Sequence, residues 1–348
     1  MNFIPECSPT AIGSFPFKEP ETTVKKIFEK LPEIPVWPQL PNVNFRENMY
    51  IQYSEGMPCA VIDDKKELLY FETSGDIFEK LEVFYEKYME KDLEYFRISP
   101  EYSSGFFAFE NYLNSNDLST VKYLKCHITG PVSFGMTVTD ENKRSAFYNE
   151  ALVDAIVKCC AMKAAWQLNR LKKFNKELIM FIDEPYLSAF GSAFVNVSRE
   201  QVITYINEIV ETIHEYGAAA GVHCCGNTDW SILMDSNIDI ISFDAYDYFQ
   251  SMTLYPDHLK KFFSRGGVLA WGIIPTSAKI ENENTDSIIK NFEEKVALLS
   301  EKGFTKNEIL DRCLITPSCG MGSLSAALSD KVLEILSAVS AELKRRRK

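Results

Sequence analysis

The chain has 348 residues, of which 46% are hydrophobic and 25% charged, a composition typical of globular proteins and unlike that of disordered or collagen-like chains. Its 37 Lys and Arg stand against 49 Asp and Glu, and the net charge of -12 argues against nucleic-acid binding, because phosphate contacts need a basic surface. No apolar run reaches the roughly eighteen residues that span a bilayer, and the N-terminus lacks the basic and apolar blocks of a signal peptide. We therefore expect a cytoplasmic protein without a membrane partner.

Short apolar runs alternate with longer amphipathic stretches along the chain. The apolar runs predict strands at 11–15, 35–38, 123–129, 178–183, 218–224, 238–244, 268–274 and 313–316. The amphipathic stretches predict helices at 20–31, 66–92, 141–174, 199–216, 255–264, 286–302 and 323–346.

Eight strands interleaved with helices predict an α/β fold, namely a parallel (β/α)8 TIM barrel that forms one domain from residue 1 to 348. An open doubly wound sheet is the competing fold, but its glycine-rich phosphate-binding fingerprint is absent from the sequence. The interval from about 55 to 120 is long for one strand-helix unit, which predicts a helical or irregular insertion in the N-terminal third.

Polar residues follow most of the predicted strands. In a barrel, the carboxyl ends of the strands open into one shared pocket, so these residues are expected to meet there. They are Ser14, Thr129-Gly130-Pro131, Asp183-Glu184-Pro185, His223-Cys224-Cys225-Gly226, Asp244 and Cys319-Gly320.

The sharpest chemical feature is the His223-x-Cys225 pair. Residues two apart in an extended segment point to the same side, so both can reach one ion while Cys224 points the opposite way. Zinc accepts imidazole nitrogen and thiolate sulfur, with Cys319 as the best third ligand and Asp244 as a candidate fourth. The nine cysteines do not suggest a disulfide framework, and packing of the pair in the core stays the alternative to a metal site.

Several of these segments resemble the catalytic barrel of the cobalamin-independent methionine synthase family. They occur in the family's order between residues 10 and 320: Thr10-Ala11-Ile12-Gly13-Ser14-Phe15-Pro16, Ile128-Thr129-Gly130-Pro131-Val132, Ile182-Asp183-Glu184-Pro185, His223-Cys224-Cys225, Ile241-Ser242-Phe243-Asp244-Ala245 and Pro317-Ser318-Cys319-Gly320. The wider superfamily also contains uroporphyrinogen decarboxylases and methylcobalamin:coenzyme M methyltransferases.

The resemblance implies a methyltransferase that moves a methyl group to the thiol of homocysteine and releases methionine. It implies Zn²⁺ at His223, Cys225 and Cys319, which would keep the acceptor thiol ionised. Ser14 and the backbone of Ile12 would hold the amino-acid carboxylate.

Four acidic residues complete the predicted site. Asp183 would take the ammonium group of homocysteine and fix its orientation, with Glu184 beside it as a further contact. Asp244 would occupy the open zinc position until substrate arrives. Glu47, in Arg46-Glu47-Asn48 after the second predicted strand, is a further candidate for the amino-acid site.

Three departures from the family pattern qualify this interpretation. The family has glutamate where this chain has the shorter Asp244, which puts direct ligation by that residue in doubt. The loop at 272–277 lacks the family's histidine near the folate donor. The chain also corresponds to one barrel of a double-length enzyme. It therefore resembles the short core form, for which a methylated corrinoid protein is the expected donor in place of folate polyglutamate.

Three competing functions stay open from the sequence, as do the methyl donor and the oligomeric state. A coenzyme M methyltransferase would need a cationic anchor for a sulfonate, whereas the Asp183-Glu184 pair favours an ammonium group. A uroporphyrinogen decarboxylase would need arginines near its N-terminus, and the segment at 12–16 carries none. The third is a non-enzymatic zinc-binding module or partner of a corrinoid protein.

Overall fold

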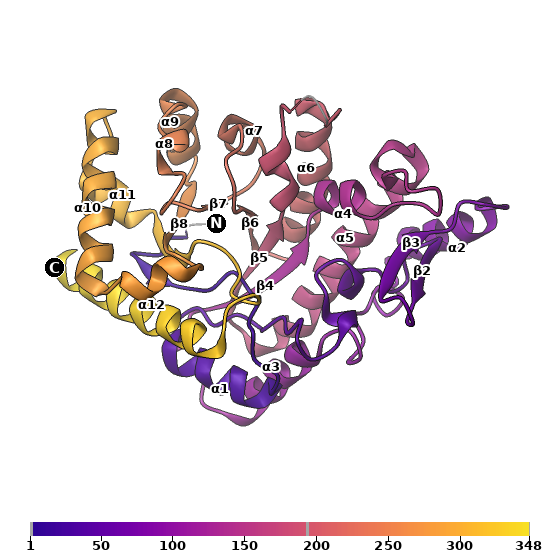
Figure 1. Ribbon diagram of the computed structural model, residues 1–348, viewed down its shortest axis with the longest axis horizontal. Helices are drawn as coiled ribbons and strands as arrows, with labels where there is room; N and C mark the ends of the chain where they lie inside the picture. Colours follow the sequence, from indigo (N-terminus) through magenta and orange to yellow (C-terminus); the bar gives the residue numbers. More distant parts are fainter. Residues whose placement is uncertain (1–2, 193–194, 348) are drawn as a thin grey trace.

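The computed structural model describes residues 3–192 and 195–347 (Figure 1). The strands are β1 Ser8–Pro9, β2 Ala60–Asp63, β3 Leu68–Phe71, β4 Tyr123–Thr129, β5 Glu177–Asp183, β6 Ala219–Cys224, β7 Ile240–Phe243, β8 Val268–Ile274 and β9 Cys313–Pro317. The helices are α1 Pro20–Lys30, α2 Phe78–Met89, α3 Ser104–Ser115, α4 Pro131–Thr137, α5 Glu150–Leu171, α6 Arg199–Glu215, α7 Trp230–Asp235, α8 Phe249–Met252, α9 Pro256–Ser264, α10 Thr285–Glu301, α11 Lys306–Asp311 and α12 Ala326–Arg347.

A curled parallel sheet forms the centre, in the order β1-β9-β8-β7-β6-β5-β4. The segment 35–39 occupies the eighth position, because Val36 bridges to Lys125 of β4 and Gln39 bridges to Ser14 beyond β1. The predicted α/β barrel is therefore confirmed. Helices surround the strands on the outside of the sheet (Figure 1).

Two strands differ from the sequence prediction. The run at 35–38 makes only isolated bridges, because Pro35 and Pro38 have no N–H to donate to a continuous ladder. The first strand is the short β1, which precedes the predicted 11–15 run. The later strands form where the apolar runs predict them, and β4 and β8 have the predicted bounds.

The structure has the predicted N-terminal insertion, but the secondary structure of the insertion differs from the prediction. The expected helix at 66–92 is wrong in its first part, because β2 and β3 form an antiparallel hairpin before α2 begins. The side chain of Asp63 accepts hydrogen bonds from the backbone N–H groups of Lys65 and Lys66, which fixes the hairpin turn. The hairpin and α2 project from one side of the barrel (Figure 1).

Side chains alternate between the barrel interior and the outer core. An inner apolar cluster fills the barrel, and its members include Ile179, Phe181, Ile240 and Leu314. The Phe181 ring takes the space that a side chain at position 221 would need, since a Cβ there would lie 2.6 Å from Phe181 Cδ1. Glycine at 221 is therefore required by packing.

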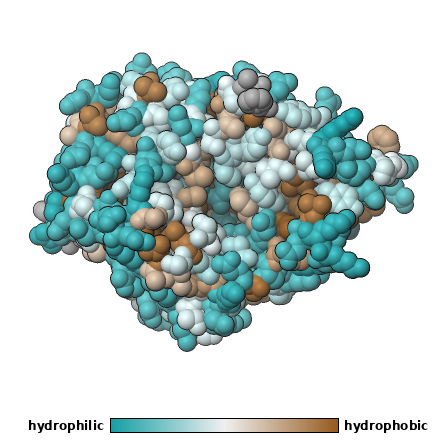
Figure 2. All heavy atoms as spheres, in the orientation of Figure 1, coloured by the Kyte–Doolittle hydropathy of each residue, from teal (hydrophilic) through white to brown (hydrophobic). Residues whose placement is uncertain are grey.

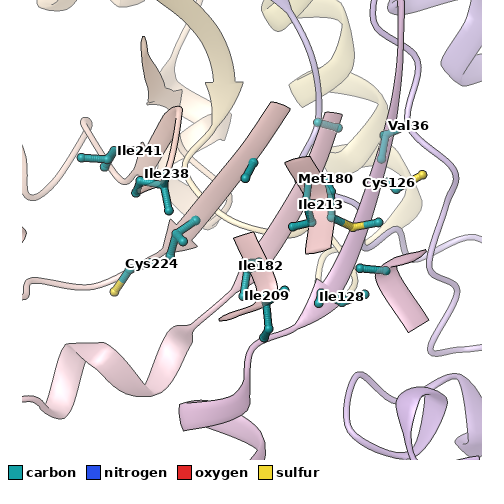
Figure 3. Close-up of a cluster of buried hydrophobic side chains, with 14 of the residues drawn as sticks. Val36, Cys126, Ile128, Met180, Ile182, Ile209, Ile213, Cys224, Ile238 and Ile241 are labelled. Carbon is teal, nitrogen blue, oxygen red and sulfur yellow. The ribbon is translucent and has the colours of Figure 1, made fainter. Parts of the chain in front are cut away.

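The outward-facing strand residues pack against the helices. Figure 3 shows Ile182, Cys224 and Ile241 from three neighbouring strands in this outer core, together with Ile209 and Ile213 of α6. Fully buried apolar side chains of this kind each contribute about 1.5–3 kcal/mol to folding. No helix in the part of the chain that the structure describes is both long and apolar enough to cross a bilayer.

Candidate metal centre

Three predicted metal ligands converge at the carboxyl end of the barrel. His223 lies near the end of β6 and Cys225 directly follows that strand, whereas Cys319 follows β9. Two strands, β7 and β8, separate β6 from β9 in the sheet, so the curvature of the barrel brings these residues together. Their ligand atoms all lie within 4.8 Å of one another.

The imidazole of His223 is oriented by a neighbouring strand. Its Nδ1 lies 3.0 Å from the hydroxyl oxygen of Ser242 on β7. Its Nε2 is buried and has no hydrogen-bond partner among the described residues. A ligating histidine commonly has this arrangement, with one ring nitrogen held by a second group and the other free for the metal. One imidazole and two thiols fit zinc, so the residues present suit the implied ion.

The thiols of Cys225 and Cys319 differ in their acidity. A hydrogen bond from Cys319, aided by His223, lowers the pKa of Cys225 to about 4 against the effect of burial. The same hydrogen bond, together with burial, raises the pKa of Cys319. The thiol of Cys225 therefore ionises more readily than that of Cys319, and a thiolate at this position favours a dication.

A cavity of about 410 Å³ opens beside these ligands. Its wall includes six residues that the sequence prediction placed in the site: Ile12, Ser14, Asp183, His223, Cys225 and Cys319. The face drawn in Figure 2 is hollowed near its middle, where Figure 1 places the ends of β4 and β5. The volume lies within the range of cavities that hold small-molecule ligands.

Asp183 presents an unpaired carboxylate to this cavity. It is the last residue of β5, and its Oδ1 is buried without a partner in the part of the chain that is described. Burial raises the pKa of Asp183 to about 6, while His223 and Lys125 act in the opposite direction. The ammonium of Lys125 lies in the barrel interior and donates to the carbonyl oxygen of Ile12 at 2.6 Å. A buried carboxylate oxygen without a donor indicates a place for a ligand's donor group.

Two of the predicted substrate contacts lie away from the cavity wall. Glu184 turns toward the start of α4, where its carboxylate accepts from the N–H groups of Val132 at 2.9 Å and Ser133 at 2.7 Å. Glu47, which precedes the insertion, accepts from the hydroxyl of Ser104 within it at 2.5 Å. Both oxygens of Glu184 are thus satisfied within the protein, whereas Oε2 of Glu47 is buried without a partner among the described residues.

Asp244 is not part of the three-ligand group. Its Oδ1 accepts a hydrogen bond from the backbone N–H of Asp247 at 2.9 Å, and burial raises its pKa to about 6. The structure thus places Asp244 directly after β7, the strand that holds Ser242, without bringing its carboxylate into the group of ligand atoms. Its role as a fourth ligand stays a prediction.

Two cavity residues, Tyr53 and His127, are absent from the predicted site. The hydroxyl of Tyr53 donates to the carbonyl oxygen of His127 at 2.9 Å and lies 3.1 Å from its Nδ1. The His127 ring stacks on Trp37 with 4.0 Å between centroids. His127 is two residues before Thr129 on β4, so strand alternation could have placed both on the cavity wall. Tyr53 lies in the insertion, where the sequence has no such period.

Comparisons with known proteins show a shared fold. No protein-family model and no curated protein matches the sequence. A B12-independent methionine synthase from a Shewanella species, solved in complex with selenomethionine, is 18% identical, with a TM-score of 0.45 over 64% of this chain and 63% of that one. The catalytic modules of a pneumococcal exo-β-D-N-acetylglucosaminidase are 12% identical, with a TM-score of 0.42 over 97% and 85%. A putative vitamin-B12 independent methionine synthase from Listeria monocytogenes is 14% identical, with a TM-score of 0.54 over 95% of this chain and 86% of that one, so the chain has the barrel fold of that Listeria protein.

Proposed function

We propose that this chain is a zinc-dependent methyltransferase that methylates the thiol of homocysteine to give methionine. The observation that carries the proposal is the convergence of His223, Cys225 and Cys319 beside a cavity whose wall includes the unpaired carboxylate of Asp183. The printed name of the Listeria protein, a putative vitamin-B12 independent methionine synthase, agrees with this assignment.

His223 through Nε2, Cys225 and Cys319 would hold the zinc ion. Bound zinc would supply a Lewis acid that keeps a substrate thiol ionised at neutral pH. Asp183 binds the ammonium group of the amino acid, and Ser14 with the Ile12 backbone meets its carboxylate. Fixing the substrate in this way places the sulfur near the ligand cluster, and such positioning contributes several kcal/mol to lowering a barrier.

The transfer is a displacement at the methyl carbon. The acceptor sulfur forms a bond to that carbon, the bond between the methyl group and its donor breaks, and the electron pair of that bond stays on the donor. The thiol proton leaves to solvent. We propose a methylated corrinoid protein as the donor, because the loop that follows β8 lacks the histidine expected near a folate donor.

The charge of the cavity wall bears on the competing functions. None of the described residues that line the cavity is a lysine or an arginine. A sulfonate, as in coenzyme M, or the carboxylates of a porphyrinogen would have no cationic side chain to pair with there. The cavity supports an acceptor with a positive group in preference to either.

A panel of methyl donors tests the proposal. Zinc-loaded protein is incubated with homocysteine and, in turn, methylcobalamin, a methylated corrinoid protein and methyltetrahydrofolate, and methionine is measured. We expect turnover with the corrinoid donors. We also expect a loss of at least about 100-fold in Cys225→Ala, since metal polarisation contributes several kcal/mol.

Cys224→Ala is the matched control, because Cys224 is adjacent to Cys225 in sequence but lies in the outer core. It should retain most of the turnover. Full turnover in Cys225→Ala, or no methionine from zinc-loaded protein with any donor, would contradict the proposed function.

A further inference from the structure

The barrel interior holds a cation that the proposed function does not use. Lys125 and Lys163 are the two basic side chains that are fully buried in the part of the chain that the structure describes. Lys125 lies on β4, and its ammonium is 4.0 Å from the centroid of the Phe181 ring. Burial lowers the pKa of Lys125 to about 8 while Asp183 acts in the opposite direction, so the amine is still mainly protonated at neutral pH. A buried charge is unfavourable unless neighbouring groups offset it, so the groups beside this ammonium are of interest.

The ammonium of Lys125 fixes residues 12–14, the segment that would meet the substrate carboxylate. It donates to the carbonyl oxygen of Ile12 at 2.6 Å, and this is its one hydrogen bond among the described residues. The next two carbonyl oxygens, at positions 13 and 14, each accept a backbone N–H at 2.8 Å, from Gln39 and from Met321. All three successive carbonyl oxygens are therefore held, and Lys125 is the only side chain that holds one.

The donors of the same segment are free. The backbone N–H groups of Ile12 and Ser14 and the Ser14 hydroxyl have no hydrogen-bond partner among the described residues, and both residues line the cavity. Gly13 between them packs against β4, since a Cβ at Gly13 would lie 2.6 Å from His127 Cδ2. Free donors on a segment whose carbonyl oxygens are occupied suit an anionic group. The positive charge of Lys125 behind the Ile12 carbonyl favours the same kind of group.

We infer that Lys125 is a positioning residue for the carboxylate of the acceptor. It fixes the Ile12 carbonyl so that the free donors of the 12–14 segment stay available to the cavity, and its charge favours an anion beside them. Lys125 does not line the cavity, so it acts through this segment and forms no direct ion pair with a ligand. This inference rests on the proposed function and adds that the site matches a zwitterion, with Asp183 for the ammonium group and Lys125 behind the contacts of the carboxylate.

The Lys125→Met variant tests the inference, because it removes the charge and the donor but keeps a long side chain. Binding to zinc-loaded protein is measured by calorimetry for homocysteine, for 4-mercaptobutanoate, which lacks the amine, and for 3-aminopropane-1-thiol, which lacks the carboxylate. We expect Lys125→Met to bind the two carboxylate-bearing thiols at least about tenfold more weakly than the unaltered protein does, since a charge-assisted contact is lost. The aminothiol should bind to both proteins with affinities within about threefold of each other.

Lys163→Met is the matched control. Lys163 on α5 is also fully buried, and it donates to the carbonyl oxygens of Phe96 at 3.5 Å and Arg97 at 3.1 Å. Its replacement should leave the affinities for all three thiols within about threefold of those of the unaltered protein. Equal weakening of all three thiols in Lys125→Met would show a merely structural role and overturn the inference, and so would unchanged binding of the two carboxylate-bearing thiols.

A measurement on the unaltered protein is independent of how the variant folds. The aminothiol should bind to it at least about tenfold more weakly than homocysteine. Equal affinities would overturn the inference and leave the methylation of a thiol, measured as methionine formation, unaffected. Binding of none of the three thiols would instead overturn the proposed function and the inference together.

Discussion

At the amino end of the barrel, the carboxylate of Glu33 accepts hydrogen bonds from Ser8 at 2.9 Å, Lys122 at 2.9 Å and Lys344 at 2.7 Å. At the carboxyl end, Oδ1 of Asp183 has no donor within the described chain. The first carboxylate is saturated by the protein, and the second is left for a ligand. These two carboxylates therefore differ in what is left for a ligand: Glu33 is satisfied within the protein, whereas Asp183 keeps one acceptor free at the end of the barrel where the cavity lies.

Two pairs of cysteines repeat the contrast. Cys7 and Cys313 lie fully buried at the amino end, where the Cys7 thiol donates to the carbonyl oxygen of Leu310 at 3.6 Å. Burial raises the pKa of Cys313 well above its ordinary value. Cys225 and Cys319 border the cavity, and the pKa of Cys225 is lowered to about 4 by the Cys319 and His223 groups beside it. Both pairs bring two thiols close together. Only the pair of Cys225 and Cys319 also has an imidazole beside it and borders a cavity.

The largest predicted effect separates these pairs. Cys319→Ala should lose most of its bound zinc, because it removes one of three protein ligands. Cys313→Ala should retain zinc and instead lower the free energy of unfolding by roughly 1–3 kcal/mol through lost packing. Metal analysis of dialysed protein and urea denaturation measure the two quantities. Full retention of zinc by Cys319→Ala would contradict the assignment of Cys319 as a metal ligand.

An intermediate effect is expected at the residue that orients the imidazole. Ser242→Ala removes the hydroxyl that lies 3.0 Å from His223 Nδ1, so zinc affinity should fall by about 10- to 100-fold. A chelator competition measures the affinity. Thr316→Val is a suitable comparison, since the Thr316 hydroxyl is also buried in the barrel but has no hydrogen-bond partner among the described residues. Equal affinities in the two variants would show that the Ser242 contact has no role in metal binding.

The smallest effect concerns acid stability at the amino end. Burial acts to raise the pKa of Glu33, but hydrogen bonds from Lys344 and Lys122 override it and lower the pKa from 4.5 to about 2. A lowered pKa contributes stability that is complete above pH 4.5 and is lost as the pH falls toward 2. After allowance for partial exposure, this contribution amounts to about 1–2 kcal/mol.

Glu33→Gln should therefore be less stable than the unaltered protein at pH 7, with the difference shrinking as the pH falls from 4.5 toward 2. Urea denaturation across this range measures it, and zinc content at pH 7 should be the same in both proteins. A stability difference independent of pH would contradict the assignment of this pKa.

The sequence predicted that His223, Cys225 and Cys319 would meet, because strand period and residue type were enough. His223 and Cys225 share a phase on one strand, and Cys319 follows another strand of the same barrel. Asp183 continues the inward phase of Ile179 and Phe181, whereas the adjacent Glu184 falls out of it and contacts α4. The family resemblance had placed Asp183 in the site, and Glu184 had been added only because it is adjacent.

The insertion was less predictable. The insertion and the short helices that precede it follow no strand alternation, so nothing in the sequence indicates that Tyr53 reaches the cavity while Glu47 accepts from Ser104. The hairpin likewise depends on one turn at Asp63 within a stretch whose apolar residues also fit a helix. The secondary structure of such segments depends on contacts with residues far away in the sequence. Local sequence patterns do not reveal these contacts.

Zinc K-edge X-ray absorption on the loaded protein tests the central claim most directly. The account predicts two sulfur ligands at about 2.3 Å and at least one nitrogen at about 2.0–2.1 Å, with the sulfur count falling to one in Cys319→Ala if residual metal is held. A first shell of nitrogen and oxygen without sulfur would contradict the account.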